Sequence, residues 1–556
     1  MATLLRLSIL AALAWAAWFV AAQTGDGSLA VEIVDSGSGL RVPAMVCITS
    51  LEDRKWRVPP DGRASPPYTT SRDFYDPAPW KPGEPGPVRL TNGEYNNNDI
   101  RSYVYEGSSA YPFWQEPAAY FVSQPFSIRL PAGRWRLAVA RGLEYRPVFE
   151  ELDIRAGQQV TRKVRLARWV DMGRSGWYSG DDHVHYPRTK PEHNQLLLTW
   201  AQAEDVHVVN VLRMGDLKAT YFEQAAYGPP GRFQHGDYLL AAGQEDPRTG
   251  IGEQGHTIAL NITSPVRDTS QYHLYDFMFD GVHQQGGLTG YAHKSWALED
   301  QRRRRPGGRA TWDSTINVVR GRIDFFEVMQ FRRLGLEDYY DFLNLGFRLT
   351  ASAGSDVPWG NTMGEVRVYV HAGRELSADA WFSAFKHGRT FVTNGPMIEL
   401  TVNGRMPGDS LKVRRNDDVR IQARAWAPPE IGAPQRLEAV AQGRVIRSVE
   451  AADVSRDELK LEFSVRASSG QWIAARATSR NGAAAHTSPV YVLVDGETFQ
   501  DREETRRLAQ KRLEILEYVK DRLQDPAFAA EYGPGEAARL RERIEEARAW
   551  YEKAAR

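Results

Sequence analysis

Residues 177–185 read Trp-Tyr-Ser-Gly-Asp-Asp-His-Val-His, a short, largely apolar run that ends in two histidines, His183 and His185. The run has the length of a strand, and residues two apart on a strand point to the same side. Both imidazoles can therefore face one ion. Imidazole combined with carboxylate suits zinc, manganese or iron better than calcium or magnesium. The stretch predicts a transition-metal site at the end of a strand.

Further candidate ligands stand at or just beyond the ends of other short apolar runs. They are Glu245 in Gly-Gln-Glu, His256 in Gly-His-Thr, His293 in Ala-His-Lys and Asp356 in Gly-Ser-Asp, with Asp216 in Met-Gly-Asp as a weaker seventh. Each of these is weak by itself; Asp356, for example, also suits the capping of a loop. The whole set predicts a metal-dependent hydrolase.

The composition excludes some partners. Lys plus Arg and Asp plus Glu both number 70, so the formal net charge is zero. No global basic field exists to attract nucleic acid or an anionic membrane. The 16 Trp and 23 Tyr suit an aromatic-lined cleft for a small-molecule or glycan-like substrate. At 556 residues the chain is long enough for about three or four domains.

The first 22 residues predict export. Arg6 precedes an uncharged run over 7–22 that ends in Val-Ala-Ala, as a cleavable signal peptide does. The run is short for a membrane span, and an uncleaved anchor is the alternative. Cys47 is the only cysteine, so no internal disulfide supports the fold. These features favour a bacterial periplasmic or extracellular protein with no membrane span after cleavage.

The strand patterns divide the rest of the chain. Residues 23–166 predict a β-sandwich that carries a Pro- and Tyr-rich insertion over 50–117. Residues 169–396 alternate strands with helical stretches, which is typical of a parallel α/β sheet or barrel. Seven strands are expected there, ending near His185, Leu212, Gly243, Ile262, Tyr291, Val328 and Ala351. The candidate ligands gather at their C-terminal ends, where barrel enzymes carry their catalytic residues.

The last two segments predict a second β-sandwich and a helical tail. Residues 397–496 show alternating strands with Gly and Pro turns, and we expect an immunoglobulin-like shape. Residues 498–556 are charged and helical, broken at Pro526 and at 533–535. A helical hairpin docked on the body fits this tail better than a coiled coil, because heptads are not sustained.

The central motifs resemble the CehA/McbA family of metallohydrolases, a branch of the PHP (polymerase and histidinol phosphatase) superfamily. The matching pieces, which span about two fifths of the chain, are 177–185, 243–245, 255–256, 292–293, 355–356 and 388–396. The resemblance implies a distorted (β/α)7 barrel with a multinuclear metal site. One ion would take His183, His185, Glu245 and Asp356. A second would take His256 and His293 and share Glu245.

A third ion, which many superfamily members hold, is not expected. Its ligands would be a Thr-Asp-His after the second strand and a His two residues past the final Asp. Here those positions read Arg-Met-Gly-Asp over 213–216, and Val357-Pro358 after Asp356. The sequence therefore predicts two divalent ions, zinc or manganese, with iron as a third candidate.

Four residues are candidates for roles beside the ions. Asp181 would hydrogen-bond a ligand imidazole and fix its tautomer. His193 is a candidate proton shuttle, Asp216 a water-binding group, and Arg389 a substrate- or loop-positioning group. Glu327, at a strand end, either faces the site or only bonds the backbone.

Three functions remain open at this point. The first is an exported two-metal hydrolase in which a metal-activated water cleaves an ester, carbamate or amide bond. The second is a phosphoesterase, the commoner chemistry of the superfamily. The third is a non-catalytic, metal-stabilised protein that binds glycans or envelope partners through its β-sandwiches. The six candidate ligands argue against the third, because purely structural sites are closed and usually need only four.

Overall fold

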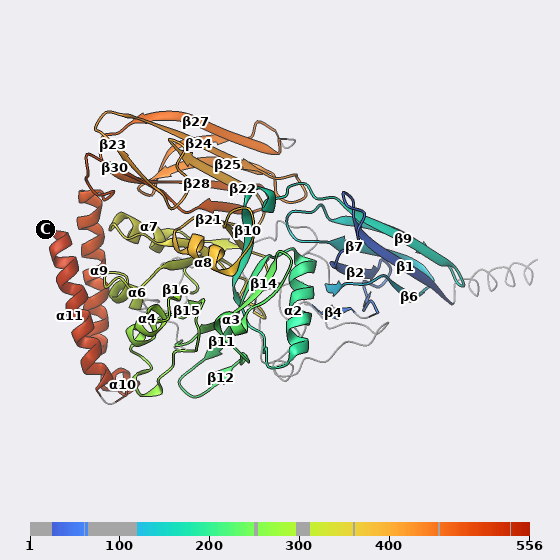
Figure 1. The fold of residues 1–556 in the computed structure, drawn as a ribbon, viewed down its shortest axis with the longest axis horizontal. Helices are drawn as coiled ribbons and strands as arrows, with labels where there is room; N and C mark the ends of the chain where they lie inside the picture. The colour runs from blue at the N-terminus through green and yellow to red at the C-terminus, as the bar shows by residue number, and fades with distance from the viewer. Residues whose placement is uncertain are drawn as a thin grey trace, which may run out of the picture. The chain divides into compact units, whose positions relative to one another are not determined.

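The computed structural model describes residues 25–60, 62–64, 119–248, 254–295, 312–359, 362–453, 456–533 and 535–556. The predicted signal peptide and most of the predicted insertion lie outside the described residues. The chain is rich in strands and ends in helices, as the sequence predicted (Figure 1). Its described residues form two compact units: one comprises those up to 64 together with 119–170 and 202–205, and the other the remainder. Among the described helices, none combines the length and apolarity needed to cross a membrane.

Two sheets make the first unit. One has the order β6–β1–β9, and the other β4–β5–β2–β7–β8 with β3 paired to β2. Their strands are β1 (Asp26–Asp35), β2 (Ala44–Ser50), β3 (Trp56–Arg57), β4 (Arg63–Ala64), β5 (Tyr120–Val122), β6 (Phe126–Pro131), β7 (Gly133–Ala140), β8 (Val148–Ile154) and β9 (Gln159–Leu166). In β6 the buried Phe126, Ile128 and Leu130 alternate with exposed residues, as expected when one face of a strand packs on a core. Leu29, Ile48 and Leu137 join that core from both sheets, which gives a β-sandwich.

Seven strands of the second unit stand where the sequence predicted them. They are β10 (Trp177–Val184), β11 (Val208–Gly215), β14 (Tyr238–Glu245), β15 (Thr257–Leu260), β16 (Leu288–Tyr291), β17 (Phe325–Gln330) and β19 (Thr350–Ala353). Pairs β10–β11, β11–β14, β16–β17 and β17–β19 are parallel. β15 is antiparallel to both neighbours, which the expectation of a parallel sheet did not include. The sheet curls back on itself, because Val184 forms a parallel bridge with Val357, just beyond β19.

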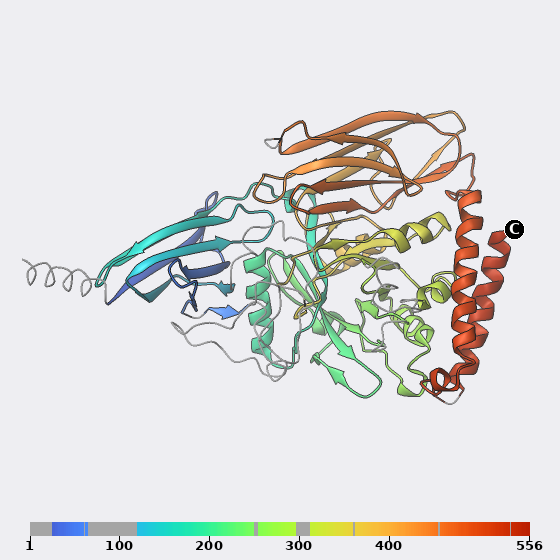
Figure 2. The same cartoon turned by 180° about the vertical axis from the view of Figure 1, so that it is seen from behind.

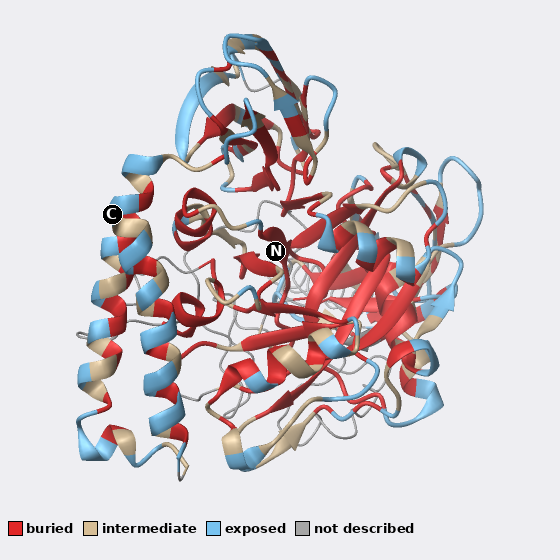
Figure 3. Ribbon diagram, turned by 60° about the vertical axis from the view of Figure 1, so that its left-hand side comes forward, coloured by how far each residue is buried: buried red, intermediate tan, exposed pale blue. Residues whose placement is uncertain are grey.

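Shorter strands also belong to this sheet, and helices lie around it. The strands are β12 (Thr220–Tyr221), β13 (Phe233–His235), β18 (Arg333–Leu334), β20 (Arg367–His371) and β21 (Thr390–Thr393). The helices are α2 (Pro191–Glu204), α3 (Gly228–Gly231), α4 (Tyr275–Gln284), α6 (Asp313–Asn317), α7 (Glu337–Asn344) and α8 (Ala378–Lys386), with 3₁₀ turns at Gly173–Ser175 and Thr269–Gln271. The strands of the sheet are almost wholly buried (Figure 3), as expected of strands covered on both faces.

The same sheet continues into the C-terminal strands, because β21 pairs with β29. These strands are β22 (Met397–Val402), β23 (Ser410–Val413), β24 (Asp418–Trp426), β25 (Pro434–Ala441), β26 (Arg444–Glu450), β27 (Glu458–Arg466), β28 (Gln471–Ser479), β29 (Ala484–Thr487) and β30 (Val490–Val494). A separate three-stranded sheet, β22–β24–β27, faces them. The predicted sandwich over 397–496 and the central segment thus share one compact unit.

Two long helices close the chain, α9 (Arg502–Arg522) and α11 (Glu536–Ala555), with the short α10 (Pro526–Ala529) between them. They lie side by side and contact α6 and α7 (Figures 1 and 2). A buried ion cluster joins α9 to the body: Arg512 Nη2 lies 2.6 Å from Asp338 Oδ1, and Lys294 Nζ lies 2.6 Å from Asp338 Oδ2. Burial opposes the charge on Asp338, but these two cations hold the pKa of its carboxyl below the usual range.

Replacing Arg512 by Met should destabilise the protein by about 3–5 kcal/mol, because the buried Asp338 and Asp341 lose a cation. Urea unfolding measures this. Arg507→Met is the matched control on the same helix, since Arg507 is 62% exposed and pairs with the surface residue Glu504; we expect a change of about 0.5 kcal/mol. Equal losses in the two variants would contradict the structural role of the cluster.

The buried His486 is expected to lower the free energy of unfolding in acid. Its Nε2 lies 2.7 Å from the Tyr340 hydroxyl, and its Nδ1 has no hydrogen-bond partner among the described residues. Burial, assisted by Arg476, lowers the pKa of His486 to about 3. The unfolded chain therefore binds the extra proton first, and stability falls as pH drops below about 6.5.

At pH 5 this one group should cost about 2 kcal/mol relative to neutral pH, from about 1.5 pH units at 1.36 kcal/mol each. His486→Gln keeps a partner for Tyr340 and should flatten the stability profile by that amount. His235→Gln, at an exposed position, should leave the profile unchanged. Unfolding free energies measured between pH 5 and 7 check this, and parallel profiles for all three proteins would contradict it.

Candidate metal centre

Six predicted ligands lie together at the strand ends of the second unit. Among the described residues, two groups could hold a metal ion: His183, His185 and Asp356, and Glu245, His256 and His293. His183 lies in β10, which His185 directly follows; Glu245 ends β14, and the other three lie just outside β15, β16 and β19. The strand register places Met214, near the end of β11, beside Glu245.

The first group is compact and buried. His183 Nε2 lies 3.0 Å from His185 Nε2 and 3.4 Å from Asp356 Oδ1. His185 Nε2 lies 3.5 Å from the same Asp356 oxygen. One oxygen of Glu245, Oε2, also reaches these imidazoles, at 3.7 Å from His183 and 3.2 Å from His185. Four donor atoms thus surround one small space.

The second group uses the other oxygen of Glu245. Glu245 Oε1 lies 2.7 Å from His256 Nδ1 and 3.7 Å from His293 Nε2. The two imidazole nitrogens are 3.0 Å apart. The side chains of His256 and His293 are 19% and 22% exposed, whereas those of His183 and His185 are fully buried. The second group is therefore the one that solvent reaches.

Hydrogen bonds on the far side of three rings orient their Nε2 atoms toward the two groups. His183 Nδ1 lies 3.2 Å from Glu327 Oε1, His185 Nδ1 lies 3.1 Å from the Leu212 carbonyl, and His293 Nδ1 lies 2.6 Å from Gln330 Oε1. An oxygen acceptor at Nδ1 requires the proton there, so in the neutral ring Nε2 carries the lone pair. Two such nitrogens face each other in the first group.

The electrostatics of the centre favour positive charge. Burial disfavours the imidazolium of His183, yet Asp356 and Glu327 raise its pKa well above the usual range. Burial likewise opposes ionisation of Glu245, yet His256, His183 and His185 hold its pKa well below the usual range. Several buried carboxylates thus lie in one region, with imidazoles as their charge partners. Such a region is stabilised by a bound cation.

Two of the six ligand candidates have left-handed backbone conformations. His293 has φ of 61° and Asp356 has φ of 56°. Such conformations cost side-chain-bearing residues of order 1–3 kcal/mol and persist where the surroundings hold them. Here Glu327 Oε2 accepts the backbone N–H of His293 at 2.7 Å, and the His183 carbonyl accepts that of Asp356 at 2.7 Å.

Glu327 is the residue whose role sequence reasoning left open. It is fully buried, and its two oxygens bind the imidazole of His183 and the backbone of His293. It therefore touches one residue of each group. The sequence predicted Glu327 at the end of a strand, whereas the structure places it in the middle of β17. Its position on the strand did not reveal its partners.

Asp181 was expected to hydrogen-bond a ligand imidazole, but in the structure it accepts hydrogen bonds from backbone N–H groups. Its Oδ1 accepts the backbone N–H groups of His183 and Ser355 at 3.1 and 3.0 Å, and its Oδ2 accepts that of Gly364 at 2.8 Å. It thus positions the chain around His183 and Asp356 rather than an imidazole. Burial raises its pKa to about 6 against these hydrogen bonds.

The remaining predicted site residues lie outside both groups. Asp216 caps a turn, accepting the backbone N–H groups of Lys218 and Ala219 at 2.8 and 2.9 Å. His193 is buried at the start of α2, with its ring 5.6 Å edge-on from Tyr186. Neither contact involves a metal-ligand candidate.

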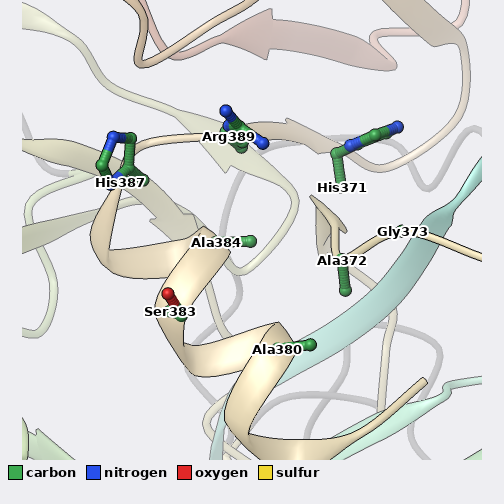
Figure 4. A pocket seen from close by; sticks show the side chains of 8 residues that line it. All are labelled: His371, Ala372, Gly373, Ala380, Ser383, Ala384, His387 and Arg389. Atoms are coloured by element: carbon green, nitrogen blue, oxygen red, sulfur yellow. The ribbon is translucent and has the colours of Figure 1, made fainter. Parts of the chain in front are cut away.

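Arg389 lies at the opposite end of the sheet. Its carbonyl accepts the N–H of His371, which pairs with Trp177 at the start of β10, six residues before His183. Six residues of strand at about 3.3 Å each separate Arg389 from the imidazoles by about 20 Å. Arg389 instead lines a surface pocket of about 360 Å³ with His371 and His387 (Figure 4).

No protein-family model and no curated protein matches the chain. Solved structures that resemble part of it include fibronectin(III)-like modules of CbhA from Clostridium thermocellum, 21% identical over 18% of this chain and 98% of theirs, TM-score 0.13. The sulfur carrier protein SoxY from Chlorobium limicola f thiosulfatophilum is 10% identical over 17% and 77%, TM-score 0.13. A CARDB domain from Pyrococcus furiosus is 17% identical over 18% and 96%, TM-score 0.14.

Proposed function

We propose that this chain is an exported hydrolase that uses two divalent transition-metal ions to cleave an ester, carbamate or amide bond. The curled sheet that carries the ligands would be a distorted barrel of the PHP type, with β15 reversed. The bond class rests on the resemblance of the central motifs to the CehA/McbA family. The metal chemistry rests on the spacing of the donor atoms.

The spacing of the first group carries the proposal. Its five measured donor-to-donor distances, with Glu245 Oε2 included, lie between 3.0 and 3.7 Å. Four ligands held tetrahedrally at about 2.0–2.1 Å from zinc stand about 3.3–3.4 Å apart. The donors therefore already have the separations that one ion requires. Manganese and iron take the same ligand types, so the set suits zinc or manganese first and iron as a third candidate.

The second group supports a catalytic rather than a purely structural role. It offers three protein donors, Glu245, His256 and His293, which is the number typical of catalytic sites that keep one position for water or substrate. Its imidazoles are also the exposed ones. A substrate would therefore approach from the side of the second group, while the first group stays buried beneath it.

The residues around the ions would prepare the site. Bound ions would supply a water activated at neutral pH and would polarise the oxygen of the attacked bond. Glu327, Gln330 and the Leu212 carbonyl fix the tautomers of three imidazoles. Phe222 and Trp359 lie against the His185 ring at 5.1 and 5.5 Å. These apolar rings limit the access of water to the buried side of the centre.

Metal analysis of the purified full-length chain should give two ions per molecule. Glu245→Ala removes one donor from each group and should bring the content below one, whereas Asp356→Ala should leave about one. His235→Ala, at an exposed histidine, should keep two. Elemental analysis after dialysis measures this. Three ions in the wild type, or none, would contradict the two-metal assignment.

A panel of aryl esters, carbamates, amides and phosphate monoesters, assayed with and without a chelator, tests the activity. We expect metal-dependent hydrolysis within the first three classes. His293→Ala should lower kcat/KM at least about 10²-fold, because a lost Lewis-acid contribution of several kcal/mol corresponds to that factor or more.

The melting temperature of His293→Ala serves as the control for folding and should change little relative to the metal-free wild type. Hydrolysis confined to phosphate monoesters would identify the protein as a phosphoesterase. A variant that loses stability, with no hydrolysis in the wild type, would favour a metal-stabilised binding protein.

A further inference from the structure

Arg188 is a buried cation that forms no ion pair with a carboxylate among the described residues. It is 6% exposed, its Nε donates to Asn194 Oδ1 at 3.0 Å, and its Nη2 donates to the Gly231 carbonyl at 3.0 Å. Its Nη1 is buried and has no hydrogen-bond partner among the residues that the structure describes. Burial lowers the pKa of Arg188 to about 10. An unpaired buried charge is costly unless another group compensates it.

Neighbouring arginines differ from Arg188 in this respect. Arg267 Nη1 lies 2.8 Å from both carboxylate oxygens of Asp246. Arg213 pairs with Glu223 at 3.2 Å and lies 3.8 Å from Asp246. The carboxylates of this region are thus already used by other cations. Within the described part of the chain, Arg188 forms no such ion pair.

A second unused donor lies near Arg188. The hydroxyl of Tyr227 is buried and also has no hydrogen-bond partner within the described ranges. Tyr227 interacts electrostatically with Arg213 and Arg188, and also with Glu223 and Asp246, the two carboxylates that lie close to Arg213. Burial raises the pKa of the Tyr227 hydroxyl, so it keeps its proton and can donate it. A guanidinium N–H and a phenol O–H together are suited to an oxyanion.

The backbone ties this pair of donors to the candidate metal centre. Arg188 follows His185 by three residues, its N–H donates to the Glu223 carbonyl at 2.9 Å, and its carbonyl accepts the N–H of Ala225 at 2.8 Å. The segment that these hydrogen bonds hold, residues 223–225, directly follows Phe222, whose ring lies 5.1 Å from that of His185. The unpaired Arg188 therefore lies on the same loops that form one wall of the centre.

We propose that Arg188 and Tyr227 form an anion-binding subsite next to the metal centre, which takes a carboxylate or phosphate group. Assigning that group to the substrate rests on the proposed function; the binding of the anion does not. The substrate would then carry a negatively charged group at a distance from the bond that is cleaved. Arg188 is a specificity-determining residue in this proposal.

Sulfate binding to the chelator-treated, full-length protein tests the subsite apart from metals and catalysis. Isothermal titration should show saturable binding by the wild type. Arg188→Met should weaken it at least about tenfold, and Arg188→Lys, which keeps the charge but not the fork of donors, should fall between. Arg232→Met is the matched control, because Arg232 already pairs with Asp379 at 2.8 Å; its affinity should equal that of the wild type.

Absence of sulfate binding by the wild type, or equal affinity in Arg188→Met, would overturn the proposal. If Arg188→Met does not fold, the wild type and Arg188→Lys still decide it. With the metal-loaded enzyme, esters with and without a carboxylate give a second readout: Arg188→Met should raise KM for the anionic ester alone and leave kcat little changed. A wild type that binds sulfate but hydrolyses nothing would refute the proposed function and leave the subsite standing.

Discussion

The carboxylate of Glu245 is the interaction on which the candidate site depends. One of its oxygens faces His183 and His185, and the other faces His256 and His293. It ends β14 and is nearly fully buried. A carboxylate in that position needs positive charge on both sides. The hydrogen bonds behind the imidazoles turn unprotonated nitrogens toward the same two spaces, and a cation in each satisfies both requirements.

Local sequence patterns were sufficient to locate the strands and the ligand candidates. The period of two along His183-Val184-His185 and the seven apolar runs are properties of short segments, so they can be read without knowing the fold. The patterns did not reveal the direction of β15, because four residues of a buried strand look the same in either direction. The signal peptide, the insertion and the bond class remain predictions.

Side-chain partners were harder to predict than positions. Arg389 follows helix α8 closely in sequence. However, β20 runs antiparallel to β10 and β21 runs antiparallel to β20, so the start of β21, where Arg389 lies, is at the far end of the sheet. Asp181 stands two residues before His183, yet it bonds backbone groups from three segments. Glu327 binds residues 144 and 34 positions away. Such contacts depend on the tertiary arrangement, which spacing along the chain does not encode.

The C-terminal helices are connected to the centre through charge. Arg512 of α9 binds Asp338 of α7, and Asp338 binds Lys294, the residue after His293. The tail therefore contributes to the surroundings of a metal-ligand candidate although it lies more than two hundred residues further along the chain. The helical hairpin therefore does more than cover apolar surface: it supplies a cation to the buried ion cluster beside His293.

The left-handed backbone at His293 and Asp356 sets these two positions apart from an ordinary core. Glycine or asparagine would adopt the same torsion angles at lower conformational cost, whereas only the native side chains complete the two donor groups. Selection for thermal stability alone would therefore favour replacing these two residues, and the donor groups that they complete would be lost. The left-handed conformations at His293 and Asp356 are thus a conformational cost that the chain carries at the positions of two ligand candidates.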